Sequence, residues 1–137
     1  MIFALDTNVV SERAKPEAEA NPLVMDFFRR CPAENLRLPS MALAEVASGV
    51  ENQPTPALRA FLGDLCEMPS LAFGEAEALA WGQMVCAALK AGQSVKARDS
   101  IIAACALANG CAVATRNGAD FAGLGVTVFN PFAAKLP

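Results

Sequence analysis

Short apolar runs alternate with longer segments of helical periodicity along this chain of 137 residues. Four runs predict buried strands, at residues 2–5, 36–38, 111–115 and 126–129. Most of these runs are separated by helices of about ten or more residues, which is the length that a crossover between parallel strands needs. The order predicts an α/β protein, a three-layer α/β/α sandwich with a central parallel sheet that occupies residues 1–137 as a single domain.

Helices are expected over residues 9–14, 22–31, 41–50, 75–91 and 100–108, with one more after Thr55. Asn21 and Thr55 each precede a proline, a combination that typically caps a helix and starts its first turn. Ser40 is expected to cap the helix that follows it, and Asp99 has the same interpretation as a cap.

The chain contains no histidine. This absence excludes serine and cysteine nucleophile systems that depend on an imidazole, zinc sites with histidine ligands, and imidazole acid–base catalysis. Tyrosine is also absent, and the formal charge is -3, so neither an aromatic stacking platform nor a broad basic face for nucleic acid is expected. Carboxylates remain as the side chains that can carry chemistry.

The five cysteines form no CxxC pair and stand in apolar contexts, so all five are expected to be buried, reduced thiols. An aspartate interrupts the first apolar run early, which argues against a secretory signal and for a cytoplasmic protein. The longest uncharged stretch, residues 100–115, has 16 residues and a central Asn-Gly pair, and is too short for a membrane span.

Four carboxylates are expected near one edge of the predicted sheet. Asp6 ends the first strand, Glu45 lies in the helix after the second, and Asp99 begins the helix that leads into the third. Asn117 and Asp120 follow that third strand. Ligands of parallel sheets bind at the carboxyl ends of the strands, so these side chains are expected to converge there.

Each acid taken alone also has an ordinary structural interpretation. Asp6 and Asp99 could cap a turn and a helix, Glu45 could face solvent from its helix, and Asp120 could be a loop residue. Their joint placement favours a site. Clustered carboxylates repel one another unless a cation neutralises them, and a set of oxygen ligands favours Mg²⁺ or Mn²⁺. Such an ion suits the hydrolysis of phosphodiester bonds.

These residues resemble those of the PIN-domain ribonucleases, in particular the VapC and FitB toxins of type II toxin–antitoxin systems. The resemblance runs from residue 2 to residue 131, with gaps of 39, 54 and 21 residues between the four acids. The motifs that carry it are Asp6-Thr7-Asn8, Pro39-Ser40 with Glu45 and Gly49, Arg98-Asp99 before Ser100-Ile101-Ile102-Ala103-Ala104, Thr115-Arg116-Asn117, and Asp120-Phe121.

The resemblance implies a metal-dependent endoribonuclease that forms a homodimer. Its inhibitor would be a small DNA-binding antitoxin whose C-terminal segment covers the site, and its RNA substrate could be a tRNA or an mRNA. By position, Asp6, Glu45 and Asp99 would hold Mg²⁺ or Mn²⁺, and Thr7 and Thr115 would orient ligands or substrate.

The sequence departs from the family pattern at Asn117, where many members carry an acid. The nearest fourth carboxylate is Asp120, which leaves open whether one or two metals bind. Near the motifs, Arg98 and Arg116 are candidate contacts for RNA phosphates, as are Lys96 and Arg13.

Two other functions stay open at this point. A PIN-like module could bind RNA or protein without cleaving RNA. A phosphoryl-transfer receiver or phosphatase-type domain fits less well, because Thr7 rather than a second acid follows Asp6.

Overall fold

The computed structural model describes residues 1–136 and contains one five-stranded sheet in which all neighbouring strands are parallel. The strand order is β3-β2-β1-β4-β5. The strands are β1 (Phe3–Leu5), β2 (Leu36–Pro39), β3 (Ser70–Leu71), β4 (Ala112–Ala114) and β5 (Val128–Phe129). Phe3 in the central strand pairs with Leu36 on one side and with Ala112 on the other. The predicted parallel α/β/α sandwich is confirmed.

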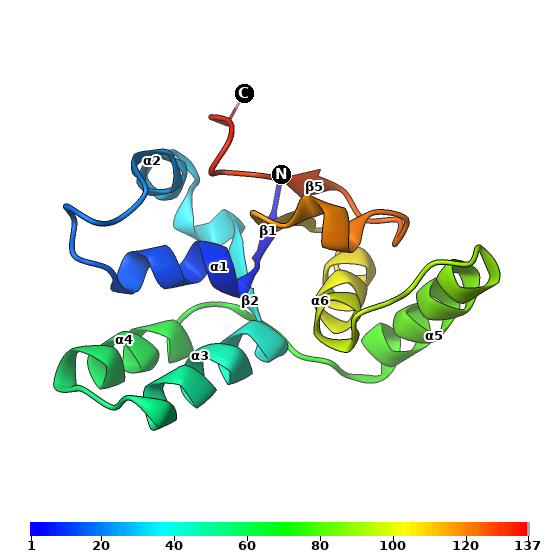
Figure 1. The fold of residues 1–137 in the computed structure, drawn as a ribbon, viewed down its shortest axis with the longest axis horizontal. Coiled ribbons are helices and arrows are strands. Elements are labelled where there is room, and N and C mark those ends of the chain that lie inside the picture. Colours follow the sequence, from blue (N-terminus) through cyan, green and yellow to red (C-terminus); the bar gives the residue numbers. More distant parts are fainter. Residues whose placement is uncertain (137) are drawn as a thin grey trace.

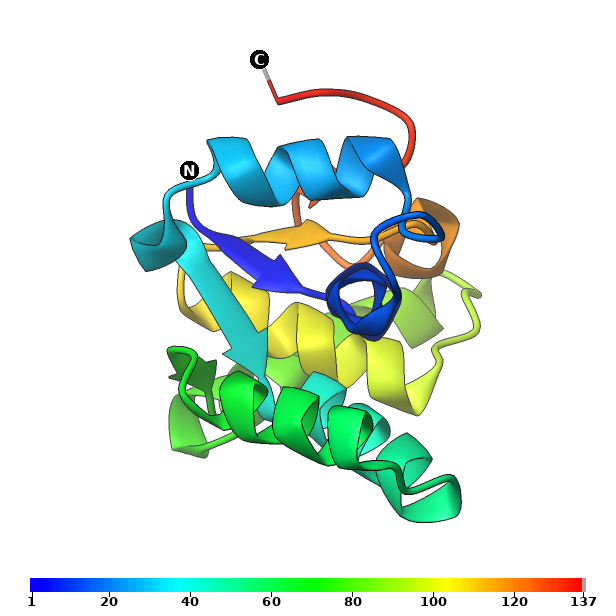
Figure 2. The same cartoon turned by 90° about the vertical axis from the view of Figure 1, so that its left-hand side faces the viewer.

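Helices cover both faces of this sheet (Figures 1 and 2). One face packs against α1 (Thr7–Val10), α2 (Pro22–Arg30), α3 (Ser40–Asn52) and α4 (Pro56–Cys66). The other face packs against α5 (Glu75–Lys90) and α6 (Ala97–Ala108). Side chains alternate along β1, so Phe3 and Leu5 enter the first core and Ala4 enters the second.

Two of the predicted helix caps are confirmed. Asn21 accepts hydrogen bonds from the backbone N–H groups of Leu23 and Val24, and Thr55 accepts one from that of Leu58. These bonds satisfy donors that the first turn of each helix leaves without a partner.

The expected caps at Ser40 and Asp99 are wrong. Helix α3 already includes Ser40, whose hydroxyl donates to the carbonyl of Leu71 in β3 at 3.3 Å instead of capping. Helix α6 begins earlier than expected, with Lys96 at its cap position. Asp99 therefore lies within the first turn, and its carboxylate is not used as the cap.

The sequence patterns missed the two-residue strand β3 and the short 3-10 turn Gly118–Phe121 that carries Asp120. All five cysteines are free, and three are buried as expected. The expectation of burial is wrong for Cys66 and Cys86, which are exposed because they lie on the outer sides of α4 and α5. Within residues 1–136, no helix combines the length and apolar character that crossing a membrane requires.

Candidate functional site

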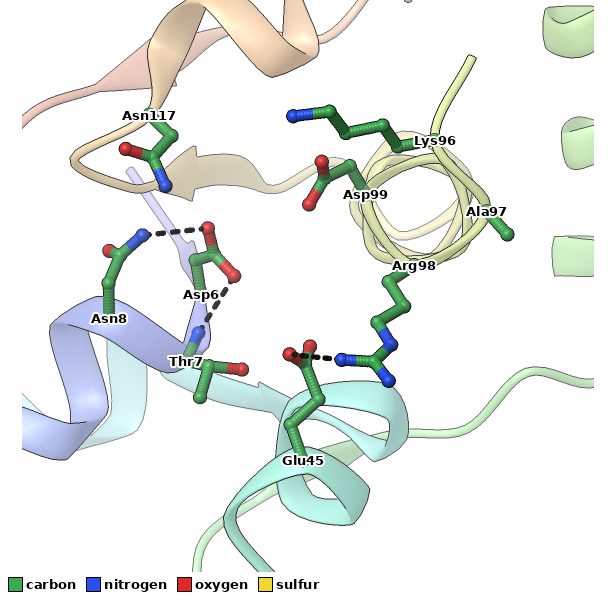
Figure 3. A pocket seen from close by; sticks show the side chains of 9 residues that line it. All are labelled: Asp6, Thr7, Asn8, Glu45, Lys96, Ala97, Arg98, Asp99 and Asn117. Carbon is green, nitrogen blue, oxygen red and sulfur yellow. Dashed lines mark hydrogen bonds and ion pairs between the residues drawn. The ribbon is translucent and has the colours of Figure 1, made fainter. Parts of the chain in front are cut away.

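A cavity of about 670 Å³ opens at the carboxyl edge of the sheet, where β1 ends and the N-terminal halves of α3 and α6 approach it (Figure 3). Three of the four predicted acids line it, although they are widely separated in the sequence. The lining residues are Asp6, Thr7, Asn8, Glu45, Lys96, Ala97, Arg98, Asp99 and Asn117.

Asp6 is the most firmly held of these acids. It follows β1 directly, is only 6% exposed, and its backbone N–H donates to the carbonyl of Ala114 in β4 at 3.0 Å. Its Oδ1 accepts from the N–H of Thr7 at 2.8 Å, so the carboxylate also caps α1, as its ordinary structural interpretation proposed. Its Oδ2 accepts from the hydroxyl of Thr115 at 2.7 Å and from the amide of Asn8 at 3.2 Å. Both oxygens are therefore fixed in orientation by the protein.

Thr115 joins the ends of β1 and β4. It is fully buried, and its hydroxyl oxygen also accepts from the backbone N–H of Asn117 at 3.0 Å. Asn8 reinforces the same junction, because its side-chain carbonyl accepts from the N–H of Arg116 at 3.1 Å. Thr115 does not line the cavity, and its hydroxyl contacts three residues that do, namely Asp6, Asn8 and Asn117.

Asp99 faces Asp6 across the cavity from the first turn of α6 (Figure 3). Burial raises the pKa of its carboxyl group above the ordinary value, and the negative charges of Asp6, Asp120 and Glu45 raise it further. Only the nearby Lys96 acts in the opposite direction. The cavity therefore holds more negative charge than its own cations neutralise.

The charges of Glu45 and Asp120 are partly neutralised by two cations at the start of α6. Arg98 approaches Glu45, with 3.5 Å between Nη1 and Oε2, and Lys96 contacts Asp120, with 2.9 Å between Nζ and Oδ1. The Asp120 carboxylate raises the pKa of Lys96, chiefly through this hydrogen bond. Asp120 lies beside the cavity but is not part of its lining.

The donor set fits a hard divalent cation. Carboxylates and an amide line the cavity, and the hydroxyl of Thr7, which points toward Glu45, is a buried atom with no hydrogen-bond partner among the described residues (Figure 3). Across residues 1–136, no three acidic or cysteine side chains are grouped closely enough to hold a metal as they stand. One reason is that the carboxylate of Glu45 is paired with Arg98.

Arg116 does not line the cavity. Its guanidinium lies 3.8 Å from Glu12 and stacks over the ring of Phe132, with 3.9 Å to the ring centroid. Glu12, which the sequence patterns did not single out, is 3% exposed and also pairs with Lys15 at 2.8 Å. No local pattern marks Glu12, because its contact with Arg116 joins segments that are far apart in the sequence.

Comparisons with known proteins identify the family of this chain. The PIN domain family model matches residues 3–125. The chain is 33% identical to the plasmid stability protein StbB of Pseudomonas syringae pv. tomato, with 97% of this chain and 100% of StbB covered. It is 30% identical to a VapC ribonuclease of Sinorhizobium fredii (96% and 98% covered) and 30% identical to toxin FitB of Neisseria gonorrhoeae (96% and 99% covered).

Solved structures show the same relationship. The crystal structure of FitAcB from Neisseria gonorrhoeae matches with a TM-score of 0.86 and 28% identity, and covers 97% of this chain and 100% of that chain. The structure of FitAB bound to a DNA fragment matches with a TM-score of 0.85 and 27% identity, covering 98% and 99%. On this evidence the chain belongs to the PIN-domain family, and the VapC and FitB toxins are among its relatives.

Proposed function

We propose that this protein is a metal-dependent endoribonuclease that cleaves RNA phosphodiester bonds as the toxin of a VapBC-type toxin–antitoxin pair. The observation that carries the proposal is the convergence of Asp6, Glu45 and Asp99 on one cavity from three distant segments. The similarity to a VapC ribonuclease along nearly the whole chain supports the same activity.

Asp6, Glu45 and Asp99 are the residues that we assign to hold Mg²⁺ or Mn²⁺. Asn117 offers its amide oxygen from the cavity wall, and Asp120 is a further carboxylate beside it. A divalent cation at such a site lowers the pKa of a water and stabilises negative charge on a phosphoryl group.

The chain's own residues prepare the site for that chemistry. Thr115 and the backbone N–H of Thr7 hold the Asp6 carboxylate in one orientation before any ligand arrives, which lowers the cost of binding. Thr7 also presents a hydroxyl that has no hydrogen-bond partner within residues 1–136 and could hold a water or a phosphate oxygen. Arg98 and Arg116 are the basic side chains that we assign to RNA phosphates.

The net charge of -3 limits how strongly such a protein holds RNA. Cations near the cavity are few, so we expect weak intrinsic affinity that falls as the salt concentration rises. Specificity would then depend on the shape of the RNA at the cavity rather than on long-range attraction.

We propose a small DNA-binding antitoxin as the cognate partner and a homodimer as the assembly of this chain. FitAB has been solved bound to DNA, and it matches this chain over nearly its whole length. Free thiols, three of them buried, agree with a reducing compartment, and we place the protein in the cytoplasm.

The test is cleavage of a pool of structured RNAs by antitoxin-free protein in Mg²⁺, Mn²⁺ or EDTA. We expect cuts that require the metal and that disappear in Asp99→Asn. The matched control is Asp64→Asn, which removes an exposed acid of α4 outside the cavity and should leave cleavage intact. Cleavage in EDTA, or equal cleavage by Asp99→Asn, would contradict the proposal.

A non-catalytic PIN-like module that binds RNA or protein remains a second candidate. The observation that favours it is the ion pair between Arg98 and Glu45, which occupies one of the assigned ligands. A folded protein that binds RNA but neither binds Mn²⁺ nor cuts any RNA of the pool would support the module.

A further inference from the structure

Some of the acids around the cavity form ion pairs with cations, and others do not. Four carboxylates lie in or beside it, namely Asp6, Glu45, Asp99 and Asp120. Two cations, Lys96 and Arg98, come from the start of α6. The net charge of this group is therefore minus two, which is the charge that one divalent cation neutralises.

The two cations are not shared evenly among the acids. Lys96 contacts Asp120 and Arg98 contacts Glu45, so the two outer acids each have a counterion. In Figure 3, the two side chains leave the helix on opposite sides of Asp99, which lies between them. Neither cation forms an ion pair with Asp6 or Asp99 among the described residues.

Asp6 and Asp99 are thus the carboxylates that most need an external cation. Asp6 is fixed by hydrogen bonds from neutral donors, which orient the carboxylate but do not cancel its charge. Asp99 faces it across the cavity (Figure 3), and the two nearby cations form their ion pairs with Asp120 and Glu45 instead. Mg²⁺ is commonly held by one or two carboxylates together with several waters, and Asp6 and Asp99 are two such carboxylates.

We infer that Lys96 and Arg98 are built-in counterions that restrict this site to one divalent cation, with Asp6 and Asp99 as its carboxylate ligands. Lys96 takes the place that a second ion would have beside Asp120, and Arg98 takes the corresponding place at Glu45. The inference rests on the proposed metal site, adds the number of ions it holds, and narrows its carboxylate ligands to Asp6 and Asp99, because Arg98 pairs with Glu45.

The test counts Mn²⁺ bound to the full-length, metal-free chain by the electron paramagnetic resonance signal of the free ion. We expect one ion per chain for the wild type. The double variant Lys96→Met/Arg98→Gln removes both charges while keeping long side chains, and it should bind two ions. Lys96→Arg/Arg98→Lys keeps both charges and should bind one ion.

The matched control is Lys135→Met/Arg59→Gln, which removes two exposed cations that do not line the cavity and should bind one ion. Circular dichroism establishes that each variant is folded before ions are counted. Two ions in the wild type, or one ion in Lys96→Met/Arg98→Gln, would overturn the inference and leave the nuclease proposal intact. No bound Mn²⁺ in the wild type would instead overturn the proposed metal site itself.

Discussion

Thr115 offers the sharpest test of how the protein holds Asp6. The change Thr115→Val keeps the shape of a fully buried side chain and removes its hydroxyl. A hydrogen bond to a charged group is worth about 1.5–3 kcal/mol, and the bond lost here is a short one of 2.7 Å to Oδ2 of Asp6. The N–H of Asn117 also loses its acceptor, which adds about 1 kcal/mol.

We therefore expect Thr115→Val to lower the free energy of unfolding by about 3 kcal/mol, a large share of the about 5–15 kcal/mol that stabilises a typical domain. Urea unfolding in EDTA measures it, with the fluorescence of Trp81 as the signal. This single tryptophan donates to the hydroxyl of Ser100 in the first turns of α6, so unfolding changes its surroundings.

Thr127→Val is the matched control, because Thr127 is exposed and its hydroxyl forms no hydrogen bond among the described residues. It should change the free energy of unfolding by less than about 0.5 kcal/mol. In an Asp6→Ala background, the cost of Thr115→Val should fall to about 1 kcal/mol, since the charged acceptor is gone. A cost for Thr115→Val as small as that of the control would refute the argument.

Three further predictions concern groups in and around the two cores. In the native protein, a thiol reagent should react quickly with Cys66 and Cys86 only. Burial raises the pKa of Cys105 to about 11, so this thiol should react only after unfolding. Fast reaction of all five thiols in the native protein would contradict this. The raised pKa of Asp99 means that its ionisation costs more free energy in the folded state than in the unfolded chain. In EDTA, the melting temperature of Asp99→Asn should therefore exceed that of the wild type near neutral pH. Below about pH 4, where Asp99 is protonated, the two melting temperatures should be equal. A melting difference that does not change with pH would refute that reasoning. Glu12→Gln breaks the ion pairs of a buried carboxylate and should cost about 2 kcal/mol in urea unfolding, and no measurable cost would show that the pairs contribute nothing.

The sequence predicted the parts of this molecule that depend on local patterns. Asp6 could be placed at the edge of the sheet because a buried strand ends beside it, and the caps at Asn21 and Thr55 follow from short-range hydrogen bonds. The strand β3 could not be predicted, because two residues carry no periodicity and Leu71 is buried only by its neighbours in space.

The contacts that organise the site were beyond such patterns. Thr115 meets Asp6 across 109 residues, and Arg98 meets Glu45 across 53. Each pair depends on how the strands and helices assemble, so residue types alone could suggest that these side chains matter but not which partners they have. The strand pattern supplied the candidate acids, the resemblance to the PIN family supplied their expected roles, and the fold supplied the counterions.

The start of α6 departs from what would stabilise the helix alone. The N-terminal end of a helix carries a partial positive charge, so cations there are locally unfavourable and acids are favourable. Asp99 follows this rule, whereas Lys96 and Arg98, which precede it in the chain, do not. Their ion pairs with Asp120 and Glu45 partly offset this local cost. The side chains of Lys96 and Arg98 are 69% and 72% exposed, and ion pairs of exposed side chains contribute little stability. Cations that return little stability, placed close to a carboxylate whose pKa is raised by burial and by neighbouring charges, are best explained by the charge that the cavity must hold in function.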